Sequence, residues 1–384
     1  MALPIKGRIR IGLIGAGLIG QAHSLMLRLI ADRTEGGVGI DSIYDVAHVA
    51  AQKLTGKWPG AKTAPSVREV LDDPAIDAVF ICTPTSSHRE ICVAAARAGK
   101  HIFCEKPLAM NVPEAAEMQT EIEHAGVLSQ VGLVMRFMAV YTVMRALAND
   151  PSAGKILAVA MRDDQDFPIR GAHPTGWRND PSLTAGGTLV EHSVHAIDLF
   201  TWMFGPIRKL YCATRNVNGA PGVEDVGFTQ FEFAAGFHGQ LASIWHRVAQ
   251  RPSNRRLEIF CENLMIVTDD DLGETIYLQR GNGPQERIEQ AGVMARFEAI
   301  ILGERPYLSP LRDILRLPYA LEDAAFFAAL RGETEPDPPF RAGVTAQRIV
   351  EVAYESARLD APVKVKISPS SRTLGSLHYR VNSS

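Results

Sequence analysis

The sequence predicts an α/β fold in two domains, the first built on a parallel sheet and the second on an antiparallel or mixed sheet. Three observations support this fold class. Short apolar segments alternate with helix-like segments in the first part of the chain, and a Gly-x-Gly-x-x-Gly turn directly follows the first of them. From about residue 139 onward, segments of alternating polarity take over. A length of 384 residues is sufficient for about two or three such domains.

The elements of the first domain follow one another as strand, turn and helix. An apolar segment runs into the glycine turn, a helix-like stretch follows, and this rhythm repeats along the chain. Gly99 suits the left-handed position that closes a helix. Because strands that alternate with helices form parallel units, we expect a parallel sheet. The expected strands are 8–14, 39–44, 75–82 and 101–104, and the expected helices are 21–32, 46–55 and 87–98.

The second domain is expected to begin after residue 137, where no linker rich in proline or serine separates it from the first. We therefore expect the two domains to pack closely. The predicted domains are 1–137 and 138–367, followed by a polar tail at 368–384. The expected elements are a loop at 167–185, helices at 188–204 and 344–357, and strands at 227–233, 239–244, 256–260 and 264–267.

Composition excludes several classes of protein. Hydrophobic residues make up 46% and charged residues 22%, as in ordinary globular proteins, which excludes a disordered or fibrous chain. A net charge of -3 offers no general attraction for nucleic acid or anionic membrane. The five cysteines contain no Cys-x-x-Cys pair, and no long apolar segment stands out. We expect a soluble, cytoplasmic protein without a zinc site or disulfides.

The glycine turn carries a dinucleotide-binding pattern. Gly15 allows the turn, Gly17 lets the backbone approach a pyrophosphate, and Gly20 permits close packing of helix against strand. Leu18 and Ile19 lie at the start of the helix, where free N–H groups and the positive end of the helix dipole favour phosphates. The alternative is a purely structural turn. Because the glycine turn lies between a strand and a helix, we favour a cofactor site over a purely structural turn.

Asp45 predicts which dinucleotide binds. It ends the second expected strand, 25 residues after Gly20, where an acid accepts hydrogen bonds from a ribose diol. Residues 46–48 provide no Arg or Lys to neutralise a 2′-phosphate, so we expect NAD over NADP. Thr83 and Pro84 end another strand at the same edge of the sheet, where ligands bind in open α/β folds.

Lys106 is the first catalytic candidate. Glu105, Lys106 and Pro107 follow a buried strand directly, which would place the lysine at the carboxyl edge of the sheet. A partly desolvated lysine can hydrogen-bond a substrate hydroxyl and stabilise a developing alkoxide. The alternative is an ordinary surface lysine.

A second candidate group lies in the expected helix 188–204. Helical spacing predicts that Glu191, His195 and Asp198 share one stripe, so that two carboxylates flank the histidine and tune it as a general base. One alternative is a core helix in which the histidine is buried and hydrogen-bonded but has no catalytic role. A metal site that includes His192 is another, but the His-Glu-x-x-His order is absent and we expect no metal.

In combination, these motifs resemble the Gfo/Idh/MocA oxidoreductase family, which includes glucose-fructose oxidoreductase and inositol dehydrogenases. The resemblance covers nearly the whole chain and depends on the order of the motifs. The matching segments are 12–20 with His23, Cys82-Thr83-Pro84, Ser87-His88, Gly99-Lys100-His101, Glu105 to Ala109, Gly186-Gly187 through Glu191, His195 and Asp198, and the stretches 154–156, 223–225 and 344–357.

The resemblance implies an N-terminal Rossmann domain and a C-terminal α/β domain whose open, largely antiparallel sheet often forms an oligomer interface. It also implies that Lys106 acts on the reacting hydroxyl and that His195 is the catalytic histidine. Glu191 replaces the Asp of inositol dehydrogenases, and Val134 replaces an Asn that many members carry.

The resulting assignments define three groups of residues. The expected catalytic residues are Lys106, His195 and Glu191. The expected cofactor-binding residues are Gly15, Gly17, Leu18, Ile19, Gly20, Asp45, Thr83, Pro84, His88, Glu105 and Lys106. The expected substrate-binding residues are Lys106, Arg136, Trp177, Arg178, Glu191 and His195.

The leading hypothesis is hydride transfer between NAD and a secondary hydroxyl of a sugar, cyclitol or related polyol, by a homo-oligomer (dimer or tetramer) that binds neither nucleic acid nor membrane. One alternative is an NAD-dependent glycosidase or lyase that acts through transient oxidation. Another is a non-enzymatic sugar or dinucleotide sensor.

Overall fold

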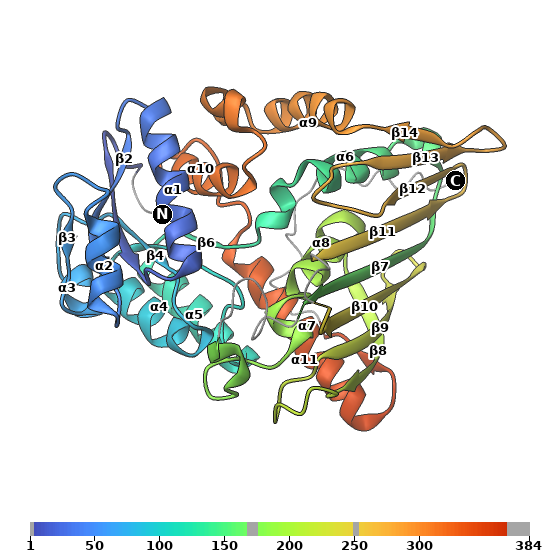
Figure 1. Cartoon of the computed structure of the whole chain (residues 1–384), viewed down its shortest axis with the longest axis horizontal. Coiled ribbons are helices and arrows are strands. Elements are labelled where there is room, and N and C mark those ends of the chain that lie inside the picture. The colour runs from blue at the N-terminus through green and yellow to red at the C-terminus, as the bar shows by residue number, and fades with distance from the viewer. Residues whose placement is uncertain (1–3, 167–175, 249–252, 367–384) are drawn as a thin grey trace.

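The computed structural model describes residues 4–166, 176–248 and 253–366 and contains two sheets (Figure 1). The first has six strands in the order β3-β2-β1-β4-β5-β6, and the second has nine in the order β14-β13-β12-β11-β7-β10-β9-β8-β15. The two sheets lie at opposite ends of the view in Figure 1, with helices between them. The predicted α/β fold class is confirmed.

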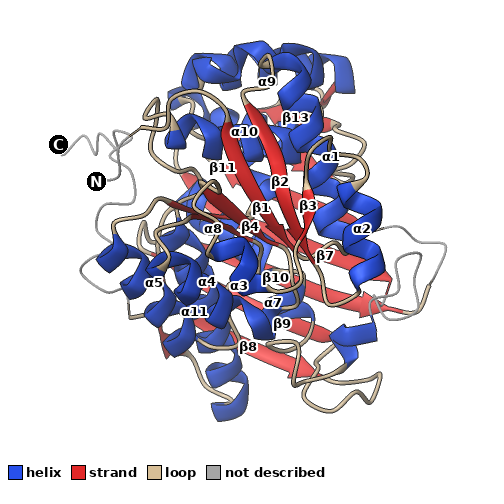
Figure 2. Ribbon diagram, turned by 90° about the vertical axis from the view of Figure 1, so that its left-hand side faces the viewer, coloured by secondary structure: helices blue, strands red, loops and turns tan. Residues whose placement is uncertain are grey.

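The six-stranded sheet is parallel throughout, as predicted. Its central strands β1, β4 and β5 are largely apolar, and all of their residues except Arg10 are buried, because helices cover each side of the sheet (Figure 2). The strands are β1 (Ile9–Ile14), β2 (Val38–Tyr44), β3 (Lys62–Thr63), β4 (Ala78–Ile81), β5 (His101–Cys104) and β6 (Ser129–Val131), and the helices are α1 (Leu18–Arg33), α2 (His48–Thr55), α3 (Val67–Leu71), α4 (His88–Arg97) and α5 (Val112–Ala125).

The nine-stranded sheet is largely antiparallel, and only the pairing of β7 with β10 is parallel among its described strands. Buried and exposed side chains alternate along β9 and β10, as expected for a sheet with one face on the core. The strands are β7 (Ile156–Asp166), β8 (Ile207–Arg215), β9 (Val226–Phe233), β10 (His238–His246), β11 (Asn254–Cys261), β12 (Leu264–Thr268), β13 (Ile276–Arg280), β14 (Glu286–Ile288) and β15 (Val363–Lys364).

Helices from the second half of the chain tie the two sheets together. Helix α10 (Pro318–Leu330) lies beside α1, and all of its residues from Ala320 to Leu330 are buried. Helix α11 (Phe340–Leu359) packs against both α5 and β8. The remaining helices are α6 (Ala139–Ala148), α7 (Thr188–Glu191), α8 (Val194–Phe204) and α9 (Gln290–Glu304), with short 3-10 helices including Val134–Phe137 and Gly176–Asn179.

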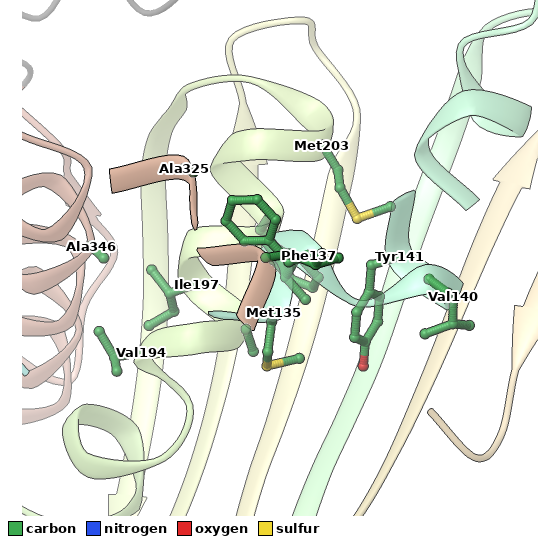
Figure 3. Close-up of a cluster of buried hydrophobic side chains, with 14 of the residues drawn as sticks. Met135, Phe137, Val140, Tyr141, Val194, Ile197, Met203, Ala325 and Ala346 are labelled. Atoms are coloured by element: carbon green, nitrogen blue, oxygen red, sulfur yellow. The ribbon is translucent and has the colours of Figure 1, made fainter. Parts of the chain in front are cut away.

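One buried cluster shows how closely the two halves pack. Met135, Phe137 and Tyr141, which lie where the chain leaves the first sheet, meet Ile197 and Met203 of α8 (Figure 3). Alanines of α10 and α11, including Ala325 and Ala346, close the cluster. The expected close packing is therefore observed. The exact boundary at residue 137 stays a prediction, and the tail at 368–384 and the first part of the expected loop 167–185 lie outside the described residues.

The expected single helix at 188–204 is wrong. The structure has two helices, α7 and α8, interrupted at His192 and Ser193. The reason is tertiary: Asp163 of β7 accepts a hydrogen bond from Ser193 at 2.7 Å and lies 2.8 Å from His192 Nε2. These contacts draw both side chains toward the sheet, which a helical repeat in the sequence does not reveal.

Candidate active site

The glycine turn has the geometry that its three glycines predict. Gly15 has a φ of +101°, and a Cβ at this position would lie 2.5 Å from the Cys82 carbonyl oxygen. A Cβ on Gly20 would lie 2.0 Å from the carbonyl oxygen of Gly15, so helix and turn touch through backbone atoms. A Cβ on Gly17, by contrast, would meet only open space. Gly17 therefore leaves the backbone at the start of α1 accessible, with Leu18 and Ile19 as the first helical residues.

Asp45 is fixed by the turn that it faces. One carboxylate oxygen accepts a hydrogen bond from the Ala16 amide at 2.6 Å, and the other accepts one from the Ala47 amide at 2.7 Å. Both oxygens keep further acceptor capacity, because a carboxylate can accept about four hydrogen bonds. Asp45 thus lies beside the glycine turn with acceptors available to a diol.

Thr83 and His88 lie at the neighbouring strand ends. The Thr83 hydroxyl oxygen is buried and has no hydrogen-bond partner among the described residues, and Pro84 follows it. His88 is buried, and its ring nitrogens lie 2.9 Å from the carbonyl oxygens of Thr83 and Pro107. Burial disfavours the His88 cation, but Cys104 and the two carbonyls outweigh this and raise its pKa to about 9. His88 holds the two loops together.

These features fit a bound dinucleotide. Gly17 offers open backbone, Thr83 offers an unsatisfied hydroxyl, and Asp45 offers acceptors at the end of β2. All of them lie at the carboxyl edge of the parallel sheet, where ligands bind in this class of fold.

Lys106 follows β5 and points toward the second domain. Its ammonium donates a hydrogen bond to the backbone carbonyl oxygen of Glu191 at 2.9 Å. Burial, followed by the Arg178 cation, lowers the pKa of Lys106, while the carboxylates of Glu191 and Glu105 act in the opposite sense. Lys106 is therefore partly desolvated, as the sequence predicts.

His195 is buried in the first turn of α8. Burial lowers the pKa of His195 well below its usual value, and the Lys106 and Arg255 cations add to this effect. Its Nδ1 atom is buried without a hydrogen-bond partner among the described residues. The imidazole is neutral at neutral pH and can accept a proton.

The expected flanking of His195 by two carboxylates is wrong. Glu191 ends α7 and accepts hydrogen bonds from Thr184 at 2.8 Å and from Arg178 at 3.3 Å. Asp198 forms a buried, bidentate ion pair with Arg136 at 2.6 and 2.8 Å. Each carboxylate therefore pairs with an arginine, and the structure gives neither of them a hydrogen bond to His195 among the described residues.

Two of the expected substrate-binding residues, Trp177 and Arg178, lie together in the structure, whereas Arg136 is engaged in an ion pair. Arg178 stacks over the Trp177 ring at 4.4 Å and contacts Glu191, which places both residues near Lys106. The guanidinium of Arg136 is committed to Asp198.

Two buried clusters were not predicted from the sequence. In the first, the expected cofactor ligand Glu105 turns toward His23 at 2.9 Å, and His23 also contacts Asp323 at 2.8 Å. In the second, Arg255 of β11 pairs with Asp163 at 2.9 Å and with Asp271 at 3.1 Å, close to His192. The spacing of His23 after the glycine turn was a usable signal, whereas Asp163 and Arg255 meet only through the register of β7 and β11.

The described ranges 4–166, 176–248 and 253–366 contain neither a metal-binding cluster nor a membrane-spanning helix. No group of three or more His, Cys, Asp or Glu side chains there is arranged to hold a metal ion. No helix in the same ranges is long and apolar enough to cross a membrane.

Comparison with known proteins agrees with this architecture. Residues 9–133 match the Gfo/Idh/MocA oxidoreductase family with its NAD-binding Rossmann fold, and residues 141–267 match a C-terminal domain of the same family. Myo-inositol 2-dehydrogenase of Thermotoga maritima is 27% identical over 72% of this chain and 79% of its own length. The 1,5-anhydro-D-fructose reductase of Ensifer adhaerens is 31% identical over 60% of this chain and 68% of its own length.

Solved structures share the fold over nearly the whole chain. Levoglucosan dehydrogenase in complex with NADH and levoglucosan superposes with a TM-score of 0.82 at 23% identity, covering 94% of this chain and all of that one. WlbA dehydrogenase from Bordetella pertussis, in complex with NADH and UDP-GlcNAcA, gives a TM-score of 0.78 at 20% identity over 95% of this chain and all of its own. The chain therefore belongs to the Gfo/Idh/MocA family of oxidoreductases, and its first domain is an NAD-binding Rossmann domain.

Proposed function

We propose that this protein is an NAD-dependent dehydrogenase that moves a hydride between the nicotinamide and a secondary hydroxyl of a sugar, cyclitol or related polyol. One observation carries the proposal: the Lys106 ammonium, from the edge of the Rossmann sheet, reaches the backbone carbonyl oxygen of Glu191 at 2.9 Å, and His195, four residues later in the chain, has a buried Nδ1 atom without a hydrogen-bond partner among the described residues. A cationic donor and a neutral base thus face one site.

The two side chains have complementary roles. His195 is neutral at working pH because burial and the Lys106 cation lower its pKa, so it can take the proton of a substrate hydroxyl. The Lys106 ammonium donates hydrogen bonds to the same oxygen and stabilises the negative charge that develops on it. When bound, NAD supplies the hydride acceptor.

Residues of the glycine turn and the strand ends are proposed to hold the cofactor. The backbone at Gly17 and the first turn of α1 would face the pyrophosphate, and the Asp45 carboxylate would accept hydrogen bonds from the ribose diol. A carboxylate at this point repels a 2′-phosphate, which supports NAD over NADP.

The substrate class is supported by the names of the relatives. They include myo-inositol 2-dehydrogenase, 1,5-anhydro-D-fructose reductase and levoglucosan dehydrogenase, all of which act on cyclic polyols or anhydro-sugars by name. A dehydrogenase is therefore favoured over the glycosidase and sensor hypotheses.

The proposal includes a homo-oligomer in the reducing cytosol. All five cysteines are free and buried, as suits a reducing compartment. Light scattering coupled to size-exclusion chromatography measures the assembly.

The test is a substrate panel. Myo-inositol, scyllo-inositol, levoglucosan and simple aldoses are each incubated with NAD or NADP while absorbance at about 340 nm reports the reduced cofactor. We expect turnover with at least one polyol and a preference for NAD. An absence of turnover with every compound, together with intact NADH binding, would contradict the proposed dehydrogenase.

A further inference from the structure

The imidazole of His23 lies inside the molecule between two acids. It projects from α1 with 0% exposure. Its Nδ1 atom lies 2.8 Å from an Asp323 oxygen, and its Nε2 atom lies 2.9 Å from a Glu105 oxygen. Ionised carboxylates only accept hydrogen bonds, so a ring whose two nitrogens face two ionised carboxylates carries both protons as an imidazolium.

Neighbouring aromatic rings fix the orientation of the His23 imidazole. Phe80, Phe103 and Tyr319 contact it edge-on, with ring centroids 5.4, 5.0 and 5.6 Å away. Burial disfavours the cation, but the charges and hydrogen bonds of Asp323 and Glu105 outweigh this and raise the His23 pKa well above its usual value. The cation is therefore the favoured form of the His23 ring at neutral pH.

Glu105 carries the contact onward to Lys106. Its first carboxylate oxygen binds His23, and its second accepts a hydrogen bond from the Lys106 backbone amide at 3.1 Å. Gly132 packs closely against this carboxylate: a Cβ at Gly132 would lie only 2.6 Å from the first oxygen of Glu105. Both oxygens of Glu105 are thus held in place. If the Glu105 carboxylate moved, the Lys106 backbone amide would lose its hydrogen bond.

We propose that His23 is a positioning residue that, through Glu105, sets where the Lys106 ammonium lies in the active site. The contacts run from Asp323 through His23 and Glu105 to Lys106, whose ammonium reaches Glu191 of the second domain. This inference rests on the proposed function, in which Lys106 contacts the substrate.

The first test uses two substitutions that each keep one of the contacts. His23→Asn keeps a nitrogen near Nδ1, facing Asp323, whereas His23→Gln keeps one near Nε2, facing Glu105. Ser24→Ala is the matched control, because Ser24 is a buried neighbour on α1 that accepts a hydrogen bond from Trp58 at 2.8 Å. Trinitrobenzenesulfonate labels accessible, unprotonated lysines, and mass spectrometry of the Lys106 peptide gives the labelling rate without substrate or cofactor.

We expect Lys106 to be labelled several-fold faster in His23→Asn than in wild type, with His23→Gln between the two and Ser24→Ala unchanged. NADH affinity, followed by fluorescence, should stay within about twofold of wild type. Equal labelling in wild type and His23→Asn would overturn the inference. If His23→Asn does not fold, Asp323→Asn, which preserves shape but removes the charge facing Nδ1 and leaves the Glu105 contact in place, is tested instead. Its Lys106 should be labelled faster than in wild type by the intermediate amount expected for His23→Gln, and labelling equal to wild type would overturn the inference.

The second test is a double-mutant cycle with the panel compound that supports turnover. His23→Asn should lower kcat by roughly tenfold to a hundredfold, because misplacement by about 1 Å has effects of that size. In a Lys106→Ala background, His23→Asn should cause no further loss, since it acts through the missing ammonium. A full further loss there would overturn the inference. Wild-type turnover in Lys106→Ala alone would instead contradict the proposed role of Lys106, and the labelling result would still decide the inference.

Discussion

The Lys106 ammonium donates a hydrogen bond to the backbone carbonyl oxygen of Glu191 at 2.9 Å, linking the edge of the Rossmann sheet to the second domain. Glu191 is the last residue of α7, and carbonyls at a helix end lack intrahelical partners. The break between α7 and α8 therefore provides the acceptor that holds Lys106.

Lys106→Ala should depress kcat by roughly 10²-fold or more, because the ammonium stabilises charge that develops chiefly in the transition state. NAD affinity should stay nearly intact, since Lys106 points to the second domain. Steady-state kinetics and NADH fluorescence titration separate the two effects. Lys106→Arg should restore little activity, because a guanidinium differs in shape and does not give up its proton. Loss of NAD binding in Lys106→Ala would assign the residue mainly to the cofactor site.

Asp45→Ala should weaken the use of NAD and narrow the preference for NAD over NADP by about tenfold or more. The substitution removes the acceptor of the ribose diol of NAD and, with it, the negative charge that repels the 2′-phosphate of NADP. The ratio of kcat/KM for the two cofactors is the measurement. Part of the loss will come from the Ala16 amide, which loses its acceptor. An unchanged ratio would contradict the assignment of Asp45 to the ribose.

Gly17→Ala and Gly20→Ala should separate cofactor binding from folding. A Cβ on Gly17 meets open space, so the free energy of unfolding should change by about 1 kcal/mol or less, while NAD affinity falls about tenfold or more. A Cβ on Gly20 would lie 2.0 Å from a carbonyl oxygen, and this overpacking should cost about 1–3 kcal/mol. Denaturant unfolding and NADH titration of both variants check the contrast. If Gly17→Ala and Gly20→Ala lowered the free energy of unfolding equally, the glycine turn would be rearranged in both variants, and the expected contrast would be wrong.

The pH dependence of kcat/KM should be set by two lowered pKa values. A His195 with lowered pKa stays an unprotonated base to lower pH, so the acidic limb should lie below the usual histidine range. A Lys106 with lowered pKa loses its ammonium earlier as pH rises, so the basic limb should lie below the usual lysine range. Initial rates across a pH series give both limbs.

Glu191→Gln and Arg178→Gln should move the basic limb in opposite directions. The Glu191 carboxylate raises the pKa of Lys106, so its removal should shift the limb to lower pH. The Arg178 cation lowers that pKa, so its removal should shift the limb to higher pH. The acidic limb should stay in place in Glu191→Gln, because Glu191 is paired with Arg178 and Thr184 rather than with His195. Shifts of the same sign in both variants would contradict this assignment.

The parallel sheet, its glycine turn and the position of Lys106 at the carboxyl edge could all be predicted from the sequence. These features are local: apolar runs of strand length, glycines required by backbone contacts, and a lysine placed directly after β5, whose bounds of His101–Cys104 match the prediction. The alternating strands of the second sheet were predicted for the same reason.

The pairing of the charged groups in the site could not be predicted from the sequence. Helical spacing suggested that Glu191 and Asp198 flank His195, but contacts of His192 and Ser193 with Asp163 interrupt the helix, and two arginines take the carboxylates. His23 and Asp323 are 300 residues apart in the chain and are joined only when α10 packs on α1. Ion pairs over such separations leave no periodic pattern in the sequence, because packing between distant elements selects the partner.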